Sequence, residues 1–309
     1  MSEALCAQTH ALALDVVAAA PAGAELALNL HPVERWAAVV NHLLDLEQFD
    51  AAKYALQRLS PLHPQAEFVQ NLSVVLEHLP AAPAATPFFD DTAREVQIAR
   101  RPASDAALIL FCGAGTHRLG VPLNAFHRWA GDIPATLIYL RDFRHKLFLD
   151  GVPALGSGLE ATLAGLHRLL QELGVRRTFC YGFSVGGFAA LLYGLLLRAQ
   201  RVLALAPAVT LEPRFNAHLR WAQAARRASG EFPALDLNLV QQYTNAAATP
   251  RATLVYGEQN WDDRLHAEYM APVRYVELHP LAGFAGHNPT IELIRRRRLG
   301  SLFGEVFGE

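Results

Sequence analysis

A serine flanked by glycines is the first feature of the sequence with catalytic potential. Ser184 lies in the run Gly182-Phe183-Ser184-Val185-Gly186, which has the pattern G-x-S-x-G. The apolar run RTFCYG before it predicts a buried strand, and GGFAALLYGLLLRAQ after it predicts a helix. A serine at such a sharp turn can present its hydroxyl as a nucleophile, and glycines leave room for the neighbouring strand and helix. The alternative is a structural serine in a glycine-rich turn.

A serine hydroxyl needs a base to accept its proton, and the chain has 13 histidines from which to choose. His287 lies in the loop AGFAGHNPT, after the last predicted strand and before a predicted C-terminal helix, IELIRRRRLG. Loops beyond the carboxyl ends of parallel strands carry the functional sites of such sheets. We therefore expect His287 to be the base. His279, beside the strand VRYVEL, is the alternative.

The imidazole in turn needs a carboxylate that fixes its tautomer and stabilises the imidazolium. The loop after the predicted strand ATLVYG supplies Glu258, Asp262 and Asp263 within GEQNWDDRLHAEYM. We expect Asp263 to be the acid, with Asp262 as the alternative, and one of the two aspartates to cap the helix that begins near DRLHAEYM. The three groups then follow the chain order Ser184, Asp263, His287.

Backbone amides that could stabilise an oxyanion are expected at two turns. Val185 directly follows the serine and would provide one N–H group. The second should come from the loop after an early strand, where ALILFCGAGTHRLG offers Gly113, Ala114 and Gly115. This loop could instead be a plain strand-to-helix turn.

From about Ala107 to Phe307 the chain resembles the α/β-hydrolase superfamily. It is most similar to bacterial serine hydrolases that carry a YGxSxGGxAA elbow, a late YGExNxxD segment and a terminal GHN. The matching segments here are YGFSVGGFAA, YGEQNWDD and AGHNP. The resemblance implies a triad of Ser184, Asp263 and His287 that cleaves a carboxylic ester or thioester, from a small molecule or an acyl carrier, through an acyl-enzyme. An acyltransferase using the same intermediate and a catalytically inactive scaffold are the alternatives.

Strands alternate with helices after residue 90, and several strands are continuous apolar runs. This pattern predicts a doubly wound, mostly parallel sheet, the α/β-hydrolase fold, over residues 91–309. A short helical cap is expected near 211–250, with Trp221 and Phe232 as possible lining residues of a substrate pocket. The Pro/Ala-rich stretch over 81–90 predicts a linker.

Residues 1–80 have apolar residues at three- and four-residue spacing, which predicts helices. The stretch EQFDAAKYALQRLSPLHP resembles one tetratricopeptide unit, with Ala52, Leu56 and Pro64 at the positions that this repeat uses for packing and closure. These helices could contact a partner protein. The alternative is a small bundle that packs on the main domain.

Composition excludes several other functions. The chain is 52% hydrophobic, and 27 Lys and Arg against 29 Asp and Glu give a net charge of -2, which does not favour nucleic acid or an anionic membrane as partner. No run reaches the about 18 apolar residues of a membrane span. Cys6, Cys112 and Cys180 form no CxxC pair, so we expect no disulfide framework, no zinc and a reducing, cytoplasmic setting. With no phosphate-binding glycine motif, we also expect no cofactor and no metal.

Overall fold

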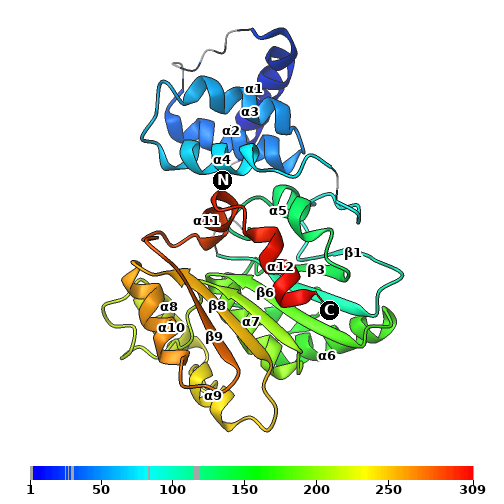
Figure 1. Cartoon of the computed structure of the whole chain (residues 1–309), viewed down its shortest axis with the longest axis vertical. Coiled ribbons are helices and arrows are strands. Elements are labelled where there is room, and N and C mark those ends of the chain that lie inside the picture. Colours follow the sequence, from blue (N-terminus) through cyan, green and yellow to red (C-terminus); the bar gives the residue numbers. More distant parts are fainter. Residues whose placement is uncertain are drawn as a thin grey trace.

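A computed structural model of the chain describes residues 3–24, 26, 28, 31–82, 84–114 and 118–308. Figure 1 shows a group of helices at one end of the molecule, next to a layered part in which helices cover a twisted sheet. The helices belong to the N-terminal part of the chain, and the sheet to the remainder. The division of the chain at residues 81–90 into a helical region and a catalytic domain stays a prediction.

The N-terminal part folds into four helices with a small core of their own. They are α1 Glu3–Ala22, α2 Val33–Asp45, α3 Phe49–Leu59 and α4 Glu67–Glu77. The apolar residues at three- and four-residue spacing gather on one face of α2, α3 and α4, and Leu43, Ala52 and Leu56 are buried where these faces meet. The helices predicted over this region are therefore present, whereas the tetratricopeptide resemblance stays a prediction.

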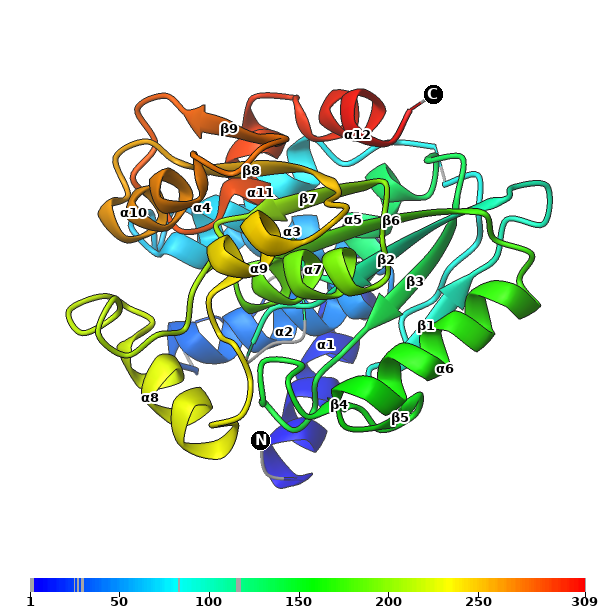
Figure 2. The ribbon, with the colours of Figure 1, turned by 90° about the horizontal axis from the view of Figure 1, so that it is seen from below.

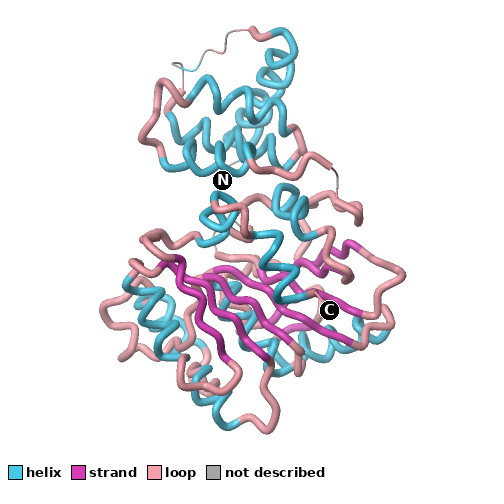
Figure 3. The backbone as a smooth tube through the Cα atoms, viewed as in Figure 1, coloured by secondary structure: helices cyan, strands magenta, loops and turns pink. Residues whose placement is uncertain are grey.

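The magenta strands of Figure 3 lie side by side in a twisted sheet. This main sheet has seven strands, in the order β1-β3-β2-β6-β7-β8-β9. The bounds are β1 Val96–Ala99, β2 Ala106–Phe111, β3 Thr136–Leu140, β6 Arg177–Phe183, β7 Arg201–Leu205, β8 Arg251–Gly257 and β9 Val276–Leu281. Only β1 is antiparallel to its neighbour. The predicted doubly wound, mostly parallel sheet is confirmed. The strand order reverses between β2 and β6, which opens a crevice at their carboxyl ends.

Both faces of the sheet are covered by helices, which explains the continuous apolar strands. In β2, Ile109 and Phe111 point into one core and Leu108 and Leu110 into the other. The first core includes α6 Leu159–Glu172 and α7 Val185–Leu196, and the second α5 Leu123–Ala130. Figure 2 shows α6 and α7 on the side of the sheet opposite the C-terminal helix.

The expectation of a single helix over IELIRRRRLG is wrong, because the chain turns within this segment. Two helices, α11 Pro289–Arg295 and α12 Leu299–Phe307, flank Arg297, whose φ is 56°. The N–H groups of Arg297 and Arg298 return to the carbonyls of Ile294 and Leu293, which is a Schellman cap with a left-handed residue. The turn lets both helices bury apolar side chains on the same face of the sheet.

Between β7 and β8 the chain forms two helices, α8 Ala222–Glu231 and α9 Leu239–Asn245, in the segment where a cap was expected. A hairpin of two short strands, β4 Gly151–Val152 and β5 Gly156–Ser157, was not predicted. Two-residue strands are too short to produce an alternating pattern in the sequence. In the part of the chain that the structure describes, every helix is too short or too polar to cross a bilayer.

Candidate active site

Ser184 lies at the turn between β6 and α7 in a strained backbone conformation. Its φ is 57° and its ψ is -119°, a region that residues with a side chain rarely adopt. A Cβ atom on Gly182 would lie 1.9 Å from the Gly186 carbonyl oxygen, and one on Gly186 would lie 1.9 Å from the Phe111 oxygen. The two glycines of the motif are thus required by the close approach of β2, β6 and α7. The Ser184 N–H donates to the Leu205 carbonyl at 2.8 Å, which ties the turn to β7.

The structure brings Ser184, His287 and Asp263 together. Ser184 Oγ lies 2.9 Å from His287 Nε2, and His287 Nδ1 lies 2.8 and 2.9 Å from the two carboxylate oxygens of Asp263. A carboxylate only accepts hydrogen bonds, so Nδ1 carries the proton and Nε2 is left as the acceptor for the serine hydroxyl. This is the tautomer that a histidine base requires.

Asp263 is the most deeply buried of the three groups. It lies in the first turn of α10 Trp261–Met270, and its side chain is 0% exposed. Burial raises the pKa of the Asp263 carboxyl, and the hydrogen bond from His287 opposes that shift. Because little water screens this carboxylate, its attraction for an imidazolium at His287 is stronger than at the surface.

The other acid and base candidates lie away from Ser184. Asp262, the alternative acid, accepts a hydrogen bond from the Arg220 N–H at 3.3 Å and pairs with the Arg220 guanidinium at 3.5 Å. Glu258 accepts a hydrogen bond from the Gly283 N–H at 2.9 Å. His279, the alternative base, lies within β9 and is half-buried. Of these candidates, the structure brings only Asp263 and His287 to the serine.

Asn260, rather than an aspartate, caps α10, so the expected aspartate cap is wrong. Its Oδ1 accepts the Asp263 N–H at 3.1 Å, and its Nδ2 donates to the Ala285 carbonyl at 3.1 Å. The same side chain thus positions the helix that carries Asp263 and the loop that carries His287. An asparagine three residues before an acid in a helix start was a visible capping signal.

Asn288, the residue after His287, caps α11 in the same way. Its Oδ1 accepts the Ile291 N–H at 3.4 Å, and its Nδ2 donates to the Gly120 carbonyl at 2.8 Å. The GHN sequence therefore contains one residue that contacts the serine and one that ties this loop to the loop after β2. Spacing along the chain gave no signal for that second contact, which joins residues 168 positions apart.

The amides expected to hold an oxyanion differ in their hydrogen bonds. The Gly113 N–H donates to the Arg118 carbonyl at 2.7 Å, so its hydrogen is already used. In the described part of the chain no acceptor is assigned to the amides of Val185, at the first position of α7, or of Ala114. Among the described candidates, these two amides therefore differ from the Gly113 amide, whose hydrogen is already bonded. Gly115 lies outside the described residues.

A small pocket of about 20 Å³ lies beside these amides. It is lined by Cys112, Gly113, Ala114, Asp142, His145, Leu147, Phe148 and Val185. His145, Leu147 and Phe148 all have a positive φ, between 54° and 60°. The Asp142 carboxylate accepts the Phe148 N–H at 2.9 Å and so helps to hold this strained loop against the pocket.

Aromatic rings surround His287. The Trp221 ring is 6.2 Å from the His287 ring, edge to face, and the Phe183 ring is 5.6 Å away. Trp221 is buried, whereas Phe232 packs partly buried against the core of the sheet. The structure thus brings Trp221, but not Phe232, to the ring of the histidine.

Metal-ligating side chains and free cysteines were the other groups with possible chemistry in the described residues. No group of three or more His, Cys, Asp or Glu side chains among them could hold a metal ion. Cys112 and Cys180 are buried, and burial raises the pKa of the Cys112 thiol to about 12, so it carries no thiolate near neutral pH.

Comparisons with known proteins give structural similarities only. No protein-family model and no curated protein matches the chain. Among solved structures, it resembles brefeldin A esterase, a bacterial homologue of human hormone sensitive lipase, at 17% identity and a TM-score of 0.46, over 79% of this chain and 85% of that one. It also resembles the capsule O-acetyltransferase of Neisseria meningitidis serogroup A, at 13% identity and a TM-score of 0.48, over 73% of this chain and 98% of that one. A third similar structure is the fluorophosphonate-binding serine hydrolase F of Staphylococcus aureus, at 10% identity and a TM-score of 0.48, over 70% of this chain and 98% of that one. Such distant likeness carries no information on substrate or activity.

A buried histidine links the Asp263 helix to the cap segment. His266 Nδ1 accepts the Val209 N–H at 3.2 Å, and its Nε2 donates to Asn216 Oδ1 at 3.1 Å. Burial lowers the pKa of His266 from 6.5 to about 3, so the ring stays neutral in the folded protein down to low pH. Sequence spacing alone did not single out this residue.

Acid should therefore destabilise the protein through His266. Below pH 6.5 the His266 imidazole gains a proton in the unfolded state but stays neutral in the folded state. The free energy of unfolding therefore falls as the pH falls towards the folded pKa. Between pH 6.5 and 4.5 we expect His266 to account for a loss of about 2 to 3 kcal/mol. Urea unfolding of the wild type and of His266→Gln across this pH range measures the contribution of His266 to the free energy of unfolding. The exposed variant His218→Gln serves as control. Equal pH slopes in the wild type and His266→Gln would contradict the assignment.

Proposed function

We propose that the protein is a serine hydrolase that cleaves a carboxylic ester or thioester through an acyl-enzyme. The observation that carries this proposal is the chain of contacts from Ser184 Oγ to His287 Nε2 at 2.9 Å and from His287 Nδ1 to Asp263 at 2.8 Å. The strained backbone of Ser184 supports it further, because strain of this kind is retained where it serves a site.

In the proposed first step, Ser184 Oγ attacks the carbonyl carbon of the substrate while His287 Nε2 takes the hydroxyl proton. The carbonyl oxygen becomes an oxyanion, which the Val185 and Ala114 N–H groups stabilise. The carbonyl forms again as the bond to the leaving group breaks, and His287 Nε2 gives its proton to the departing oxygen or sulfur. The product is an acyl ester on Ser184.

In the second step a water molecule replaces the leaving group. His287 Nε2 takes a proton from the water as its oxygen attacks the acyl carbon, and then returns the proton to Ser184 Oγ when the acyl ester breaks. Asp263 accepts the hydrogen bond from Nδ1 throughout and stabilises the imidazolium in both steps. No group other than the substrate and water is consumed.

Covalent labelling of the serine tests the proposal directly. A fluorophosphonate probe should label the wild type and exposed-serine control Ser157→Ala at the same rate, and should leave Ser184→Ala unlabelled. We expect His287→Ala to slow labelling by about 10³-fold or more, because the hydroxyl loses its base. Thermal unfolding establishes that each variant is folded. A folded wild type that resists labelling would favour an inactive scaffold.

Replacing each of the two neighbouring aspartates by asparagine should lower kcat to very different extents. Asp263→Asn removes the carboxylate that orients His287, and we expect kcat to fall by about 10⁴-fold. Asp262→Asn breaks a half-exposed ion pair with Arg220, which contributes about 0 to 1 kcal/mol, so kcat should change by about threefold or less. Steady-state hydrolysis of a p-nitrophenyl ester compares them. Similar mild losses in both variants would argue against Asp263 as the acid.

The pocket beside the two amides favours short acyl groups. About 20 Å³ accommodates one or two water-sized groups, which corresponds to the alkyl part of an acetyl or propionyl group. We expect kcat/KM for p-nitrophenyl acetate to exceed that for the octanoate by about tenfold or more.

Leu147→Ala should widen this pocket and improve the hexanoate relative to the acetate, because Leu147 is a partly buried lining residue. Arg144→Ala, at an exposed position of the same loop that does not line the pocket, serves as a control for general disturbance of the loop. A wild type that prefers octanoate would place the acyl chain elsewhere.

A further inference from the structure

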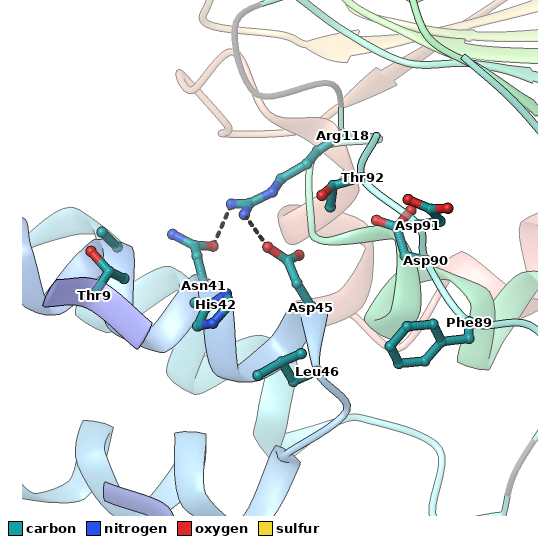
Figure 4. Close-up of a pocket in the computed structure, with 11 residues that line it drawn as sticks. Thr9, Asn41, His42, Asp45, Leu46, Phe89, Asp90, Asp91, Thr92 and Arg118 are labelled. Atoms are coloured by element: carbon teal, nitrogen blue, oxygen red, sulfur yellow. Dashed lines mark hydrogen bonds and ion pairs between the residues drawn. The ribbon is translucent and has the colours of Figure 1, made fainter. Parts of the chain in front are cut away.

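The guanidinium of Arg118 joins the loop after β2 to the N-terminal helix α2. It donates hydrogen bonds to Asn41 Oδ1 and, at 3.1 Å, to Asp45 Oδ2 (Figure 4). The side chains of Arg118 and Asp45 are 21% and 17% exposed, so the ion pair is largely shielded from water. The pair and Phe89 are among the residues that line a pocket of about 650 Å³. Figure 4 shows the labelled lining side chains, with Phe89 apart from the Arg118–Asp45 pair.

The same residue contacts the proposed active site through its backbone. The Arg118 carbonyl accepts the Gly113 N–H at 2.7 Å, and Gly113 is followed directly by Ala114, which lines the small pocket together with Val185. Gly113 itself packs closely on β6, since a Cβ atom built on it would lie 3.3 Å from the Phe183 ring and carbonyl oxygen. The Arg118 carbonyl thus bonds to the residue directly before Ala114.

The residues after Arg118 are held by the histidine loop. The Leu119 carbonyl accepts the Thr290 hydroxyl at 3.0 Å, and the Gly120 carbonyl accepts Asn288 Nδ2 at 2.8 Å. Gly120 has a φ of 85°, and a Cβ atom on it would lie 2.6 Å from Asn288 Oδ1. Thus α2 holds one side of this loop, and the segment that follows His287 holds the other.

Helix α2 is itself fixed to the sheet. The Asp45 carbonyl, at the end of the helix, accepts a hydrogen bond from Asn124 Nδ2, and Asn124 Oδ1 accepts the Asp90 N–H at 2.9 Å. Asp90 pairs with Arg141 directly after β3, and both side chains are almost completely buried, at 3% and 2% exposed. This continuous set of contacts gives α2 a defined place from which to hold Arg118.

We propose that the N-terminal helices are part of the catalytic machinery, because α2 positions the oxyanion-stabilising loop. Asp45 and Asn41 act as positioning residues: they hold Arg118, the Arg118 carbonyl holds Gly113, and Gly113 sets the Ala114 amide in the small pocket that Val185 also lines. The inference rests on the proposed hydrolase function. It gives the N-terminal helices a role within this chain in place of, or besides, contact with a partner protein.

Removing one partner of the Asp45–Arg118 pair leaves the other charge unpaired and largely buried, which destabilises the fold. Thermal unfolding therefore has to establish that each variant is folded. Burial raises the pKa of the Asp45 carboxyl even though the Arg118 guanidinium lies beside it, so desolvation offsets much of the attraction. The pair is therefore better suited to specify a geometry than to stabilise the fold.

Amide exchange tests the tether, by which we mean the contacts that run from α2 through Arg118 to Gly113. This test does not depend on catalysis. Hydrogen–deuterium exchange at the Gly113 amide should become about tenfold faster or more in Asp45→Ala and in Arg118→Ala. It should stay unchanged in Arg35→Ala, which removes an arginine of the same helix that bonds to Gln8 instead. Unchanged exchange in the first two variants, with the fold intact, would overturn the tether.

Steady-state kinetics on the same variants test whether the position of the Ala114 amide affects catalysis. We expect kcat for an acetyl ester to fall by about tenfold in Asp45→Ala and Arg118→Ala, with KM changed by about twofold or less, because an oxyanion donor acts on the transition state. The double variant should be no slower than Arg118→Ala, since that single change already removes the guanidinium contacts with both Asp45 and Asn41. Faster exchange with normal kcat would overturn the positioning role. A wild type that neither hydrolyses esters nor reacts with fluorophosphonate would refute the proposed function, while exchange still decides the tether.

Discussion

The left-handed backbone of Ser184 depends on three backbones that approach one another with no side chain between them. Gly182 and Gly186 permit this approach, since a Cβ atom on either would meet a carbonyl oxygen at 1.9 Å. The strain is balanced by the surrounding sheet, because β6 is hydrogen-bonded on both sides and the Ser184 amide is bonded to Leu205. The outcome is a hydroxyl held above the carboxyl end of the sheet, in the crevice that the change in strand order opens between β2 and β6.

The remaining parts of the site are held by side chains that fix two loops at once. Asn260 caps the helix of Asp263 and bonds to the histidine loop, and Asn288 caps α11 and bonds to the loop after β2. Each asparagine satisfies the free N–H groups at a helix start while it sets the distance between loops. The proposed acid, base and oxyanion amides are therefore mutually positioned, and the N-terminal helix α2 joins the same set of contacts through Arg118.

Local patterns were sufficient to predict much of this protein. Continuous apolar runs indicated buried parallel strands, and the strand, Gly-x-Ser-x-Gly and helix sequence around Ser184 indicated a strained turn. The positions of His287 and Asp263 followed from the rule that loops at the carboxyl ends of parallel strands converge. The helix expected through Arg297 failed because a left-handed residue closed α11 early, and arginine gives no sequence signal for that conformation.

The sequence by itself determined the doubly wound sheet and the residue types able to do chemistry, because both depend on patterns of a few adjacent residues. Only the tertiary structure decided between Asp262 and Asp263 as the neighbour of His287, since adjacent residues on a helix point in directions about 100° apart. It also decided that the Gly113 amide is already bonded and that Arg118 connects the N-terminal helices to the site. The Arg118–Asp45 contact joins residues more than 70 positions apart, and the state of the Gly113 amide depends on one hydrogen bond. No local pattern encodes the folding that brings such groups within hydrogen-bonding distance of one another.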